Sequence, residues 1–305
     1  MNDGGEPRRW AKDLGGGWFL ILLNLTGKIA ATIVASTAPP TALALWFVPD
    51  ALLGYHLFVV RAQGVLVMHR RFATSRHEVW LTIDDGPDPH DSPLILELLA
   101  NYGARATFFV VGDKVAAQPD LVRALIAAGH EVAHHTQTHP VASFWCASAA
   151  RVRRELDRGT ATLLAAGVRP TRFRPPAGLR NLWLKRALAA RGLECIGWSA
   201  RGLEHRGGDV ASVVERVTRG VAPGAILLLH EGRGLPQAIR LVAIERVLAR
   251  LQELGYRCVV PTPAQLGKQW NTNGAPSHNR ALTRARPCDN ESRAFEGSAS
   301  QSTTS

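Results

Sequence analysis

The run Glu78-Val79-Trp80-Leu81-Thr82-Ile83-Asp84-Asp85-Gly86-Pro87 is the most informative part of this sequence. Residues 78–83 form a short apolar run typical of a buried β-strand, and two carboxylates follow it directly. Successive side chains of an extended backbone point to opposite sides, so a bend is needed before Asp84 and Asp85 can face one cavity. Gly86-Pro87 supplies such a bend, although an ordinary polar turn contains the same residues. Both interpretations stay open on this run alone.

Further along, His135-Thr136-Gln137-Thr138-His139 carries two histidines four residues apart. We expect the two imidazoles to share a face of a helical turn, which is one way of presenting them to zinc. In a chain with 11 histidines, such a pair also arises by chance. His134 should point elsewhere, in a packing or surface role. The pair and the two aspartates could hold one metal ion beside one free base, the minimum for hydrolysing an amide or ester.

From about residue 78, short apolar runs alternate with amphipathic stretches. Seven runs are predicted to be buried strands, over 78–83, 106–111, 131–133, 172–174, 194–198, 225–229 and 257–260. Helix-like stretches lie between them, and glycines follow several of these as C-terminal caps. This alternation predicts an α/β fold with a parallel sheet, either doubly wound or closed as a barrel.

Polar residues gather at the carboxyl ends of the predicted strands. They are Asp84, Asp85, His135, Arg174, Trp198 and His230. In a barrel these ends share one face, and active sites are built on that face. Independent structural residues would have no reason to align in this way, so the pattern predicts a single functional site.

The first part of the chain has a different composition. Residues 1–17 form a basic segment, and residues 18–68 are mostly apolar. The uncharged run 29–49 is long enough to cross a bilayer at about 1.5 Å per residue, although Pro39-Pro40 would kink or break it. We interpret residues 18–68 as an anchor in a bacterial-type inner membrane, with a cleaved signal peptide or a packed extension as alternatives. A single span would put the rest of the chain outside, whereas a hairpin would keep it inside between basic flanks.

The composition limits the partners of the protein. Its 305 residues are 46% hydrophobic and carry a net charge of +11. The arginines are spread along the chain without a basic block interleaved with aromatic residues, which argues against nucleic-acid binding and favours an anionic lipid surface or an acidic glycan.

Four cysteines form no CxxC pair, so neither a sulfur-ligated zinc site nor a disulfide framework is expected. Residues 267–305 lack periodicity and are expected to be disordered. No protein partner is predicted.

Six short motifs follow one another in a recognisable order. They are Asp-Asp-Gly-Pro (84–87), Ala-Thr-Phe-Phe-Val (106–110), Gly-His-Glu-Val (129–132), His-Thr-x-x-His-Pro (135–140), Phe-Arg-Pro-Pro-x-Gly (173–178) and Leu-Leu-Leu-His (227–230). This order resembles the polysaccharide deacetylases with a NodB homology domain, carbohydrate esterase family 4. The resemblance implies a catalytic domain over 77–266. Its fold would be a distorted, incomplete (β/α) barrel of about seven parallel strands behind an N-terminal hydrophobic extension.

The resemblance also implies a metal site. Asp85, His135 and His139 match the family's ligands for a divalent metal and leave positions open for water and for the acetyl oxygen of the substrate. Two imidazoles and one carboxylate suit Zn²⁺ first, and Co²⁺ or Ni²⁺ also fit them. Such a metal would lower the pKa of water and polarise the acetyl carbonyl.

Three residues match the proton-transfer groups of the family. Asp84 matches the catalytic base, and His230 matches the general acid that protonates the departing sugar amine. Arg174 resembles the arginine that keeps the base ionised and oriented. The structural alternatives are a salt bridge at the barrel rim for Arg174 and an ordinary strand-end histidine for His230.

The substrate groove is expected beside these groups. The backbone N–H of Ala177, after Pro176, would help to stabilise the oxyanion. Leu229 would floor the acetyl pocket, although an ordinary core leucine would give the same pattern. Trp198 would either wall the groove or pack the barrel. Alanine replaces the aromatic residue that many family members carry at 177, so one wall of the groove is missing. The family's aspartate after strand five is also missing, and we expect Glu204 to be the carboxylate partner of His230.

These features together predict an enzyme. The expected activity is a metal-dependent removal of acetyl groups from the N-acetylated amino sugars of a glycan or glycoconjugate. One alternative is an O-acetyl esterase or a deacylase acting on a small or lipid-linked substrate. Another is an inactive glycan-binding module, against which the free base beside a metal site argues.

Overall fold

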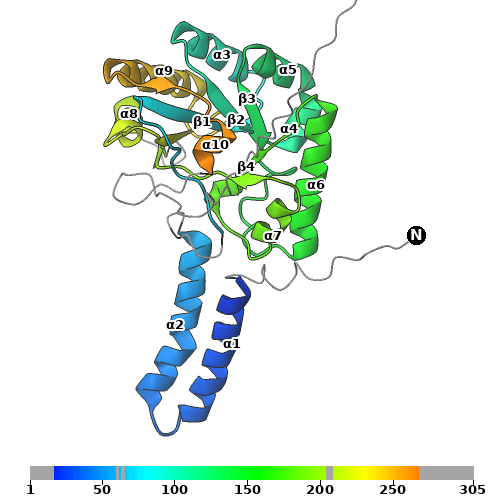
Figure 1. Cartoon of the computed structure of the whole chain (residues 1–305), viewed down its shortest axis with the longest axis vertical. Coiled ribbons are helices and arrows are strands. Elements are labelled where there is room, and N and C mark those ends of the chain that lie inside the picture. Colours follow the sequence, from blue (N-terminus) through cyan, green and yellow to red (C-terminus); the bar gives the residue numbers. More distant parts are fainter. Residues whose placement is uncertain (1–16, 60–61, 63–65, 204–208, 268–305) are drawn as a thin grey trace, which may run out of the picture.

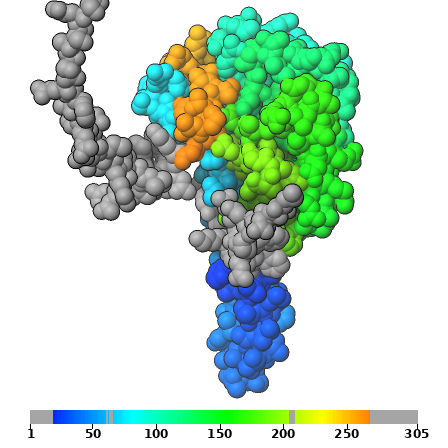
Figure 2. All heavy atoms as spheres, turned by 45° about the vertical axis from the view of Figure 1, so that its right-hand side comes forward, coloured from blue at the N-terminus to red at the C-terminus, as the bar shows by residue number. Residues whose placement is uncertain are grey.

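The structure is a computed structural model that describes residues 17–59, 62, 66–203 and 209–267. It consists of a helical hairpin and an α/β part from which the hairpin projects (Figure 1). Figure 2 shows the same projection in a second view. The basic segment expected over 1–17 and the disordered tail expected over 267–305 lie outside the described residues, apart from their inner ends.

The hairpin is formed by α1 (Gly17–Val34) and α2 (Pro39–Phe58). Pro39-Pro40 stands in the first turn of α2, where a missing backbone N–H breaks no intrahelical hydrogen bond. Of the two effects expected from Pro39-Pro40, a kink or a break, the structure shows a break, because a turn divides the run 29–49 between two helices. By length and composition alone, α2 could cross a membrane.

The two helices of the hairpin approach each other closely. A Cβ atom at Gly27 would lie 2.7 Å from the carbonyl oxygen of Leu45, so this crossing requires glycine. Lys28 Nζ lies 3.1 Å from Asp50 Oδ1, and the amide of Asn24 donates to the same carboxylate oxygen. The charges of the hairpin are thus paired between its own helices.

The α/β part is built on one parallel sheet. Its strands are β1 (Glu78–Gly86), β2 (Ala106–Val110), β3 (Glu131–His134), β4 (Arg172–Phe173), β5 (Glu194–Cys195), β6 (Ala200–Arg201), β7 (Ile226–His230) and β8 (Arg257–Cys258). Seven of them follow the order β5-β4-β3-β2-β1-β7-β6, and β8 pairs with the start of β1. The residues of β1 are all buried, as expected for a central strand covered on both faces. An α/β fold with an incomplete barrel is confirmed.

Helices cover the outside of the curled sheet (Figure 1). They are α3 (Ser92–Asn101), α4 (Gly112–Ala117), α5 (Pro119–Ala127), α6 (Ala149–Ala165), α7 (Leu184–Ala189), α8 (Val210–Thr218) and α9 (Gln237–Glu253). The short helix α10 (Pro263–Leu266) instead packs through Leu266 on the inner side of the sheet, in a cluster with Trp80 and Phe109. A 3₁₀ turn over Pro176–Gly178 follows β4. Apolar residues of β1 and α9 belong to one hydrophobic cluster, so the core lies between the sheet and its helices.

The strand expected over 194–198 is shorter than predicted: only residues 194 and 195 form a strand, β5, and β6 follows at the opposite edge of the sheet. β5 pairs with β4, whereas β6 pairs with β7. Only four residues, 196–199, join them, so the two edges lie within about 18 Å of each other and the sheet must curl. His69 bridges Ile196, and Arg71 bridges Ala225. The segment that follows the hairpin therefore runs along the seam of the barrel.

Candidate active site

Asp84 and Asp85 reach the same cavity because the backbone bends between them. Asp84 is still in register with its neighbours on β2 and β7, whereas the register shifts before Gly86. Asp85 has a φ of 75°, in the left-handed region that a non-glycine residue seldom adopts. The predicted bend exists, and it lies at Asp85 itself. His135 Nε2 then lies 3.8 Å from Asp84 Oδ2 and 3.5 Å from Asp85 Oδ1.

Asp85, His135 and His139 come together as a cluster of potential metal ligands. One ligand atom from each lies within 4.8 Å of the others, and within the described part of the chain no other such group of three is found. His139 Nε2 lies 3.0 Å from Asp85 Oδ1. Asp85 and His135 are almost completely buried, and the side chain of His139 is 16% exposed. The cluster is thus enclosed on the protein side and reachable through His139.

The helical turn expected for His135 and His139 is not formed. The segment between them is a bent loop in which Thr136 has a φ of 69° and His139 a φ of 53°. The ring centroids of the two histidines are 4.8 Å apart. Two left-handed residues, and not helical periodicity, therefore bring the imidazoles together.

Glu155 of α6 holds this loop in place. Its carboxylate accepts hydrogen bonds from the backbone N–H groups of Gln137 and Thr138 at 3.0 and 2.9 Å, and from the Thr138 hydroxyl at 2.7 Å. The buried His134 accepts from the N–H of Thr136 at 2.9 Å and packs against Gly159, where a Cβ atom would lie 2.5 Å from its ring. Sequence analysis missed Glu155, because it lies far along the chain from the loop and nothing in the sequence indicates that the two are in contact.

The protonation states of the cluster suit metal ligation. His135 Nδ1 lies 2.8 Å from the carbonyl oxygen of Arg174, so Nδ1 carries the proton and Nε2 offers a lone pair to the cluster. Burial lowers the pKa of His139, with Asp85 opposing it, which favours a neutral imidazole. Burial opposes the ionised form of Asp85, but the two imidazoles outweigh it and hold the pKa of this carboxyl well below its ordinary value.

Both carboxylate oxygens of Asp85 are buried without a well-aligned hydrogen bond. The guanidinium Nε of Arg233 lies 2.8 Å from Oδ2 and compensates the charge. Buried carboxylates are normally hydrogen-bonded or bound to metal, so these orphaned oxygens fit a metal ligand.

Asp84 is held by a different partner. Arg174 Nη1 donates to Asp84 Oδ1 at 2.6 Å and to the hydroxyl of Thr82 at 2.8 Å. The remaining donors of Arg174 reach the carbonyls of Ile196 and Gly197 at 3.2 and 2.9 Å. Arg174 is fully buried, and its guanidinium lies 4.1 Å from the centroid of the Phe109 ring. One oxygen of Asp84 is therefore fixed, while the other lies 3.8 Å from Nε2 of the potential ligand His135.

The remaining predicted residues lie around these groups. His230 ends β7 directly beside Asp84 in the register of the sheet, and it is half-buried. Leu229 is buried in the core. Ala177 is exposed with a φ of 53°, in the turn that also contains the buried Pro176. Trp198 is 6% exposed and packs against this turn. Glu204 lies outside the described residues, so its role stays a prediction.

Comparison with known proteins identifies the family. The sequence profile described as polysaccharide deacetylase matches residues 72–196. A chitooligosaccharide deacetylase of Bradyrhizobium sp. is 38% identical over 156 residues, which cover 50% of this chain and 70% of that protein. The chain belongs to the polysaccharide deacetylase family.

Other relatives of this deacetylase agree. A peptidoglycan-N-acetylglucosamine deacetylase of Bacillus cereus is 34% identical over 183 residues, which cover 59% of this chain and 84% of that protein. Among solved structures, a family 4 carbohydrate esterase from Streptomyces lividans in complex with acetate matches with a TM-score of 0.57 and 31% identity, covering 63% of this chain and 97% of that one. The protein is therefore a hydrolase of the deacetylase type.

Two further residues border the site of this deacetylase, and sequence analysis did not single them out. Arg233 contacts Asp85, as described above. Glu231 follows His230, is fully buried, and accepts a hydrogen bond from the Ser92 hydroxyl at 2.5 Å. Both stand in a glycine-containing loop after β7, a composition that predicts only a turn.

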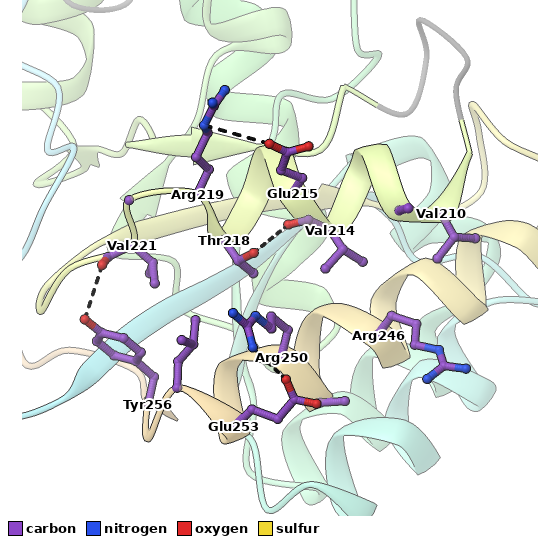
Figure 3. A pocket seen from close by; sticks show the side chains of 14 residues that line it. Val210, Val214, Glu215, Thr218, Arg219, Val221, Arg246, Arg250, Glu253 and Tyr256 are labelled. Atoms are coloured by element: carbon purple, nitrogen blue, oxygen red, sulfur yellow. Dashed lines mark hydrogen bonds and ion pairs between the residues drawn. The ribbon is translucent and has the colours of Figure 1, made fainter.

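A second hollow lies away from these residues, between α8 and α9 (Figure 3). Its volume is about 990 Å³, and none of the predicted site residues lines it. Four of its charged side chains form two ion pairs, since Arg250 Nη1 lies 2.8 Å from Glu253 Oε2 and Arg219 Nε lies 3.8 Å from Glu215 Oε1. Because no predicted site residue lines this hollow, it is not the candidate active site.

Proposed function

We propose that this deacetylase removes acetyl groups from N-acetylated amino sugars of a glycan or glycoconjugate, with a divalent metal. The observation that carries the proposal is the side-by-side placement of two different carboxylates. Asp85 belongs to the cluster of three potential ligands, while Asp84 is paired with Arg174 and keeps one oxygen directed at that cluster. A binding protein would not need this division between ligand and base.

The metal would be held by Asp85, His135 and His139. The orphaned oxygens of Asp85 and the free Nε2 of His135 fit such an ion. Zn²⁺ suits this ligand set first, and Co²⁺ and Ni²⁺ also suit it. When bound, the ion supplies Lewis-acid chemistry, which polarises the acetyl carbonyl and acidifies water.

The chain's own residues would move the protons. Asp84 is placed to take a proton from water, because Arg174 orients one of its oxygens and the other faces the cluster. His230, beside Asp84, is placed to give a proton to the departing nitrogen. The backbone N–H of Ala177 would stabilise charge on the acetyl oxygen. Water and the amide are thereby converted into acetate and a free amine.

The substrate class follows from the relatives. The Bradyrhizobium protein is named for chitooligosaccharides, and the Bacillus cereus protein for the N-acetylglucosamine of peptidoglycan. Both names describe glycans that carry an N-acetylated amino sugar. A sugar of this kind is the proposed substrate.

We also propose that the hairpin anchors the enzyme in the inner membrane. Lys28 and Asp50 pair with each other between its two helices, and many large apolar side chains are exposed on its outer surface. The flanks of the hairpin in the sequence are basic, with Arg8-Arg9 before it and His69-Arg70-Arg71 after it. The positive-inside tendency then favours the cytoplasmic side for the α/β part.

Thiol labelling of the exposed Cys146 in spheroplasts tests this topology. Labelling that occurs only after the inner membrane is permeabilised would support the cytoplasmic side. Labelling without permeabilisation would contradict it.

One assay separates the proposed activity from its alternatives. The purified, metal-loaded protein is incubated with chitooligosaccharides, peptidoglycan fragments and acetylated xylan, and both acetate and free amine are measured. Equal amounts of acetate and amine from the first two substrates are expected. Acetate without amine would indicate an O-acetyl esterase. Bound metal with neither product would indicate a glycan-binding module.

A further inference from the structure

The hairpin is fastened to the α/β part through a buried arginine. The guanidinium of Arg180 donates to the carbonyl oxygens of His56 and Val59 at 3.2 and 2.6 Å, and also to that of Ala62. The backbone N–H of Arg180 donates to the carbonyl oxygen of Leu57 at 3.0 Å. The last carbonyls of a helix have no intrahelical partner, and a positive charge is favourable there. Arg180 therefore caps the C-terminal end of α2.

Arg180 stands in a loop of the active site. It is three residues from Ala177, so the two Cα atoms lie within about 11 Å of each other. The neighbouring Asn181 donates to the carbonyl oxygens of Phe144 and Ala147 at 2.9 and 2.8 Å, in the loop that begins at the metal-ligand candidate His139. Both loops leave the carboxyl ends of strands. The hairpin is thus attached to the catalytic face of the barrel.

Further contacts join the hairpin to the α/β part. The rings of Phe58 at the end of α2 and Trp145 lie 5.0 Å apart. The segment that follows the hairpin pairs along the barrel seam through His69 and Arg71. Together with the hydrogen bonds of Arg180, these contacts hold the hairpin against the catalytic face.

The surface around the junction has the composition of a membrane interface. Ile33 and Phe47 on the hairpin are 73% and 59% exposed, more apolar surface than a soluble domain usually shows. The 20 residues of α2 span about 30 Å, the thickness of a bilayer core. Phe58 ends α2 and contacts Trp145, while Trp183, Lys185 and Arg186 follow Arg180 within six residues of the chain; we call these five residues the collar. In membrane proteins, aromatic and basic side chains are enriched at the boundary between the apolar core of the bilayer and water.

Granted the deacetylase activity proposed above, we propose that the hairpin and collar dock the catalytic face against the bilayer and that the substrate is an acetylated amino-sugar glycan attached to a membrane lipid. His139 lies within about 18 Å of Phe144 along the loop that meets the collar, and Ala177 is closer still to Arg180. The loops that carry His139 and Ala177 thus also carry the residues that hold the hairpin, which favours a sugar presented at the membrane surface. A lipid anchor keeps such a sugar at that level.

The orientation is tested on the full-length protein in phosphatidylethanolamine–phosphatidylglycerol vesicles that contain spin-labelled lipid. A fluorophore is placed on the exposed Cys146 of the collar loop in a Cys288→Ser background, since Cys195 and Cys258 are buried. The matched control carries the label at Asn101→Cys, at the far end of α3, with Cys146→Ser. Quenching at 146 and none at 101 is expected. Equal quenching at both positions, or none at 146, would overturn the docking.

The substrate class is tested with one tetrameric chitooligosaccharide in two forms, free and attached to a dialkylglycerol in the same vesicles. We expect kcat/KM to be at least about tenfold higher for the lipid-attached form, because both partners share the membrane surface. Phe58→Ser should reduce this ratio severalfold, whereas Val242→Ser, an exposed apolar position on α9, should leave it unchanged.

The outcomes separate this inference from the proposed activity. Hydrolysis of the free oligosaccharide with no preference for the lipid-attached form, or with a preference that Phe58→Ser leaves intact, would reject the docking inference alone. Hydrolysis of neither form by metal-loaded protein would reject the deacetylation of amino sugars itself.

Discussion

His135 and Arg174 share one hydrogen bond that joins the two halves of the site. Nδ1 of His135 donates to the carbonyl oxygen of Arg174 at 2.8 Å, while the guanidinium of Arg174 holds Asp84 at 2.6 Å. The residue that orients the proposed base thus also fixes the tautomer of a proposed metal ligand. Ligand geometry and base geometry are coupled through the end of β4.

The two neighbouring aspartates should differ in their effects. Asp84→Asn is expected to retain metal and to lose at least about 100-fold in kcat, because the base is removed while the ligand set is intact. Asp85→Asn should lose metal and activity together. Metal content by elemental analysis and acetate release are measured on both variants. Loss of metal in Asp84→Asn alone would mean that the two roles are exchanged.

Arg174→Gln should destabilise the protein as well as inactivate it. The substitution leaves the carboxylate of Asp84 buried without its cation, and breaking a buried pair in this way costs about 3–5 kcal/mol. The free energy of unfolding is measured by urea denaturation. The double variant Arg174→Gln/Asp84→Asn should recover part of the loss, because no charge is then left unpaired. A double variant as unstable as Arg174→Gln would contradict the importance of the pair.

Glu155→Gln should weaken metal binding without touching a ligand. The substitution removes the charge that orders the backbone between His135 and His139, and supporting residues of this kind typically affect metal affinity about 10–100-fold. Asp157→Asn on the same helix is the control, since its exposed carboxylate pairs with Arg191 and not with the loop between the two histidines. Affinities come from metal titration of the apoprotein. Equal affinities in the two variants would contradict the role of Glu155.

The sequence predicted the parts of the fold that depend on burial and strand direction. β1 and β7 are long apolar runs, and their carboxyl ends bring Asp84 and His230 together as parallel topology requires. These features need only the apolar pattern and the chain direction. The position of the site on the barrel could therefore be predicted before any contact was known.

Features that depend on tertiary contacts were not predicted. The segment 135–139 has helical spacing, but hydrogen bonds to Glu155 stabilise a loop with two left-handed residues instead. β6 is two residues long, too short to show an apolar period. Arg233 contacts Asp85 from a turn, and the composition of that turn does not indicate where its side chains point. Each of these outcomes is decided by a partner distant in sequence, which overrides local propensity.

Glu231 should make stability depend on pH. Burial raises the pKa of its carboxyl from an ordinary value of 4.5 to about 8. Between these values the folded state holds a proton that the unfolded state has lost, so stability falls as pH rises, by up to about 1.4 kcal/mol per pH unit. Glu231→Gln removes this contribution. The free energy of unfolding of Glu231→Gln, relative to that of the wild type, should therefore increase from pH 5 to pH 8.

Urea denaturation at several pH values in this range measures the Glu231 effect. Glu253→Gln, at an exposed position on α9, is the control and should follow the wild type throughout. Taking the difference from the wild type removes the titration of the buried histidines, which is common to all three proteins. A difference that stays constant from pH 5 to pH 8 would show that Glu231 titrates at its ordinary pKa.

Gly178→Ala should disturb the turn that presents Ala177. Gly178 has a φ of 69°, and its Cβ atom would lie 2.3 Å from the ring of Trp198. The left-handed backbone alone costs roughly 1–2 kcal/mol, and displacing a buried ring adds about 1–3 kcal/mol. We expect a loss of stability and a lower kcat with unchanged metal affinity, because the proposed ligands lie on other loops.

Gly167→Ala is the matched control for this substitution. Gly167 has a φ of 84° but no atom within 4 Å of its added Cβ, so it carries the backbone cost without the clash. The difference in unfolding free energy between the two variants therefore measures the contact with Trp198. If both variants lose the same stability and Gly178→Ala keeps its kcat, Trp198 does not hold the turn in its active position.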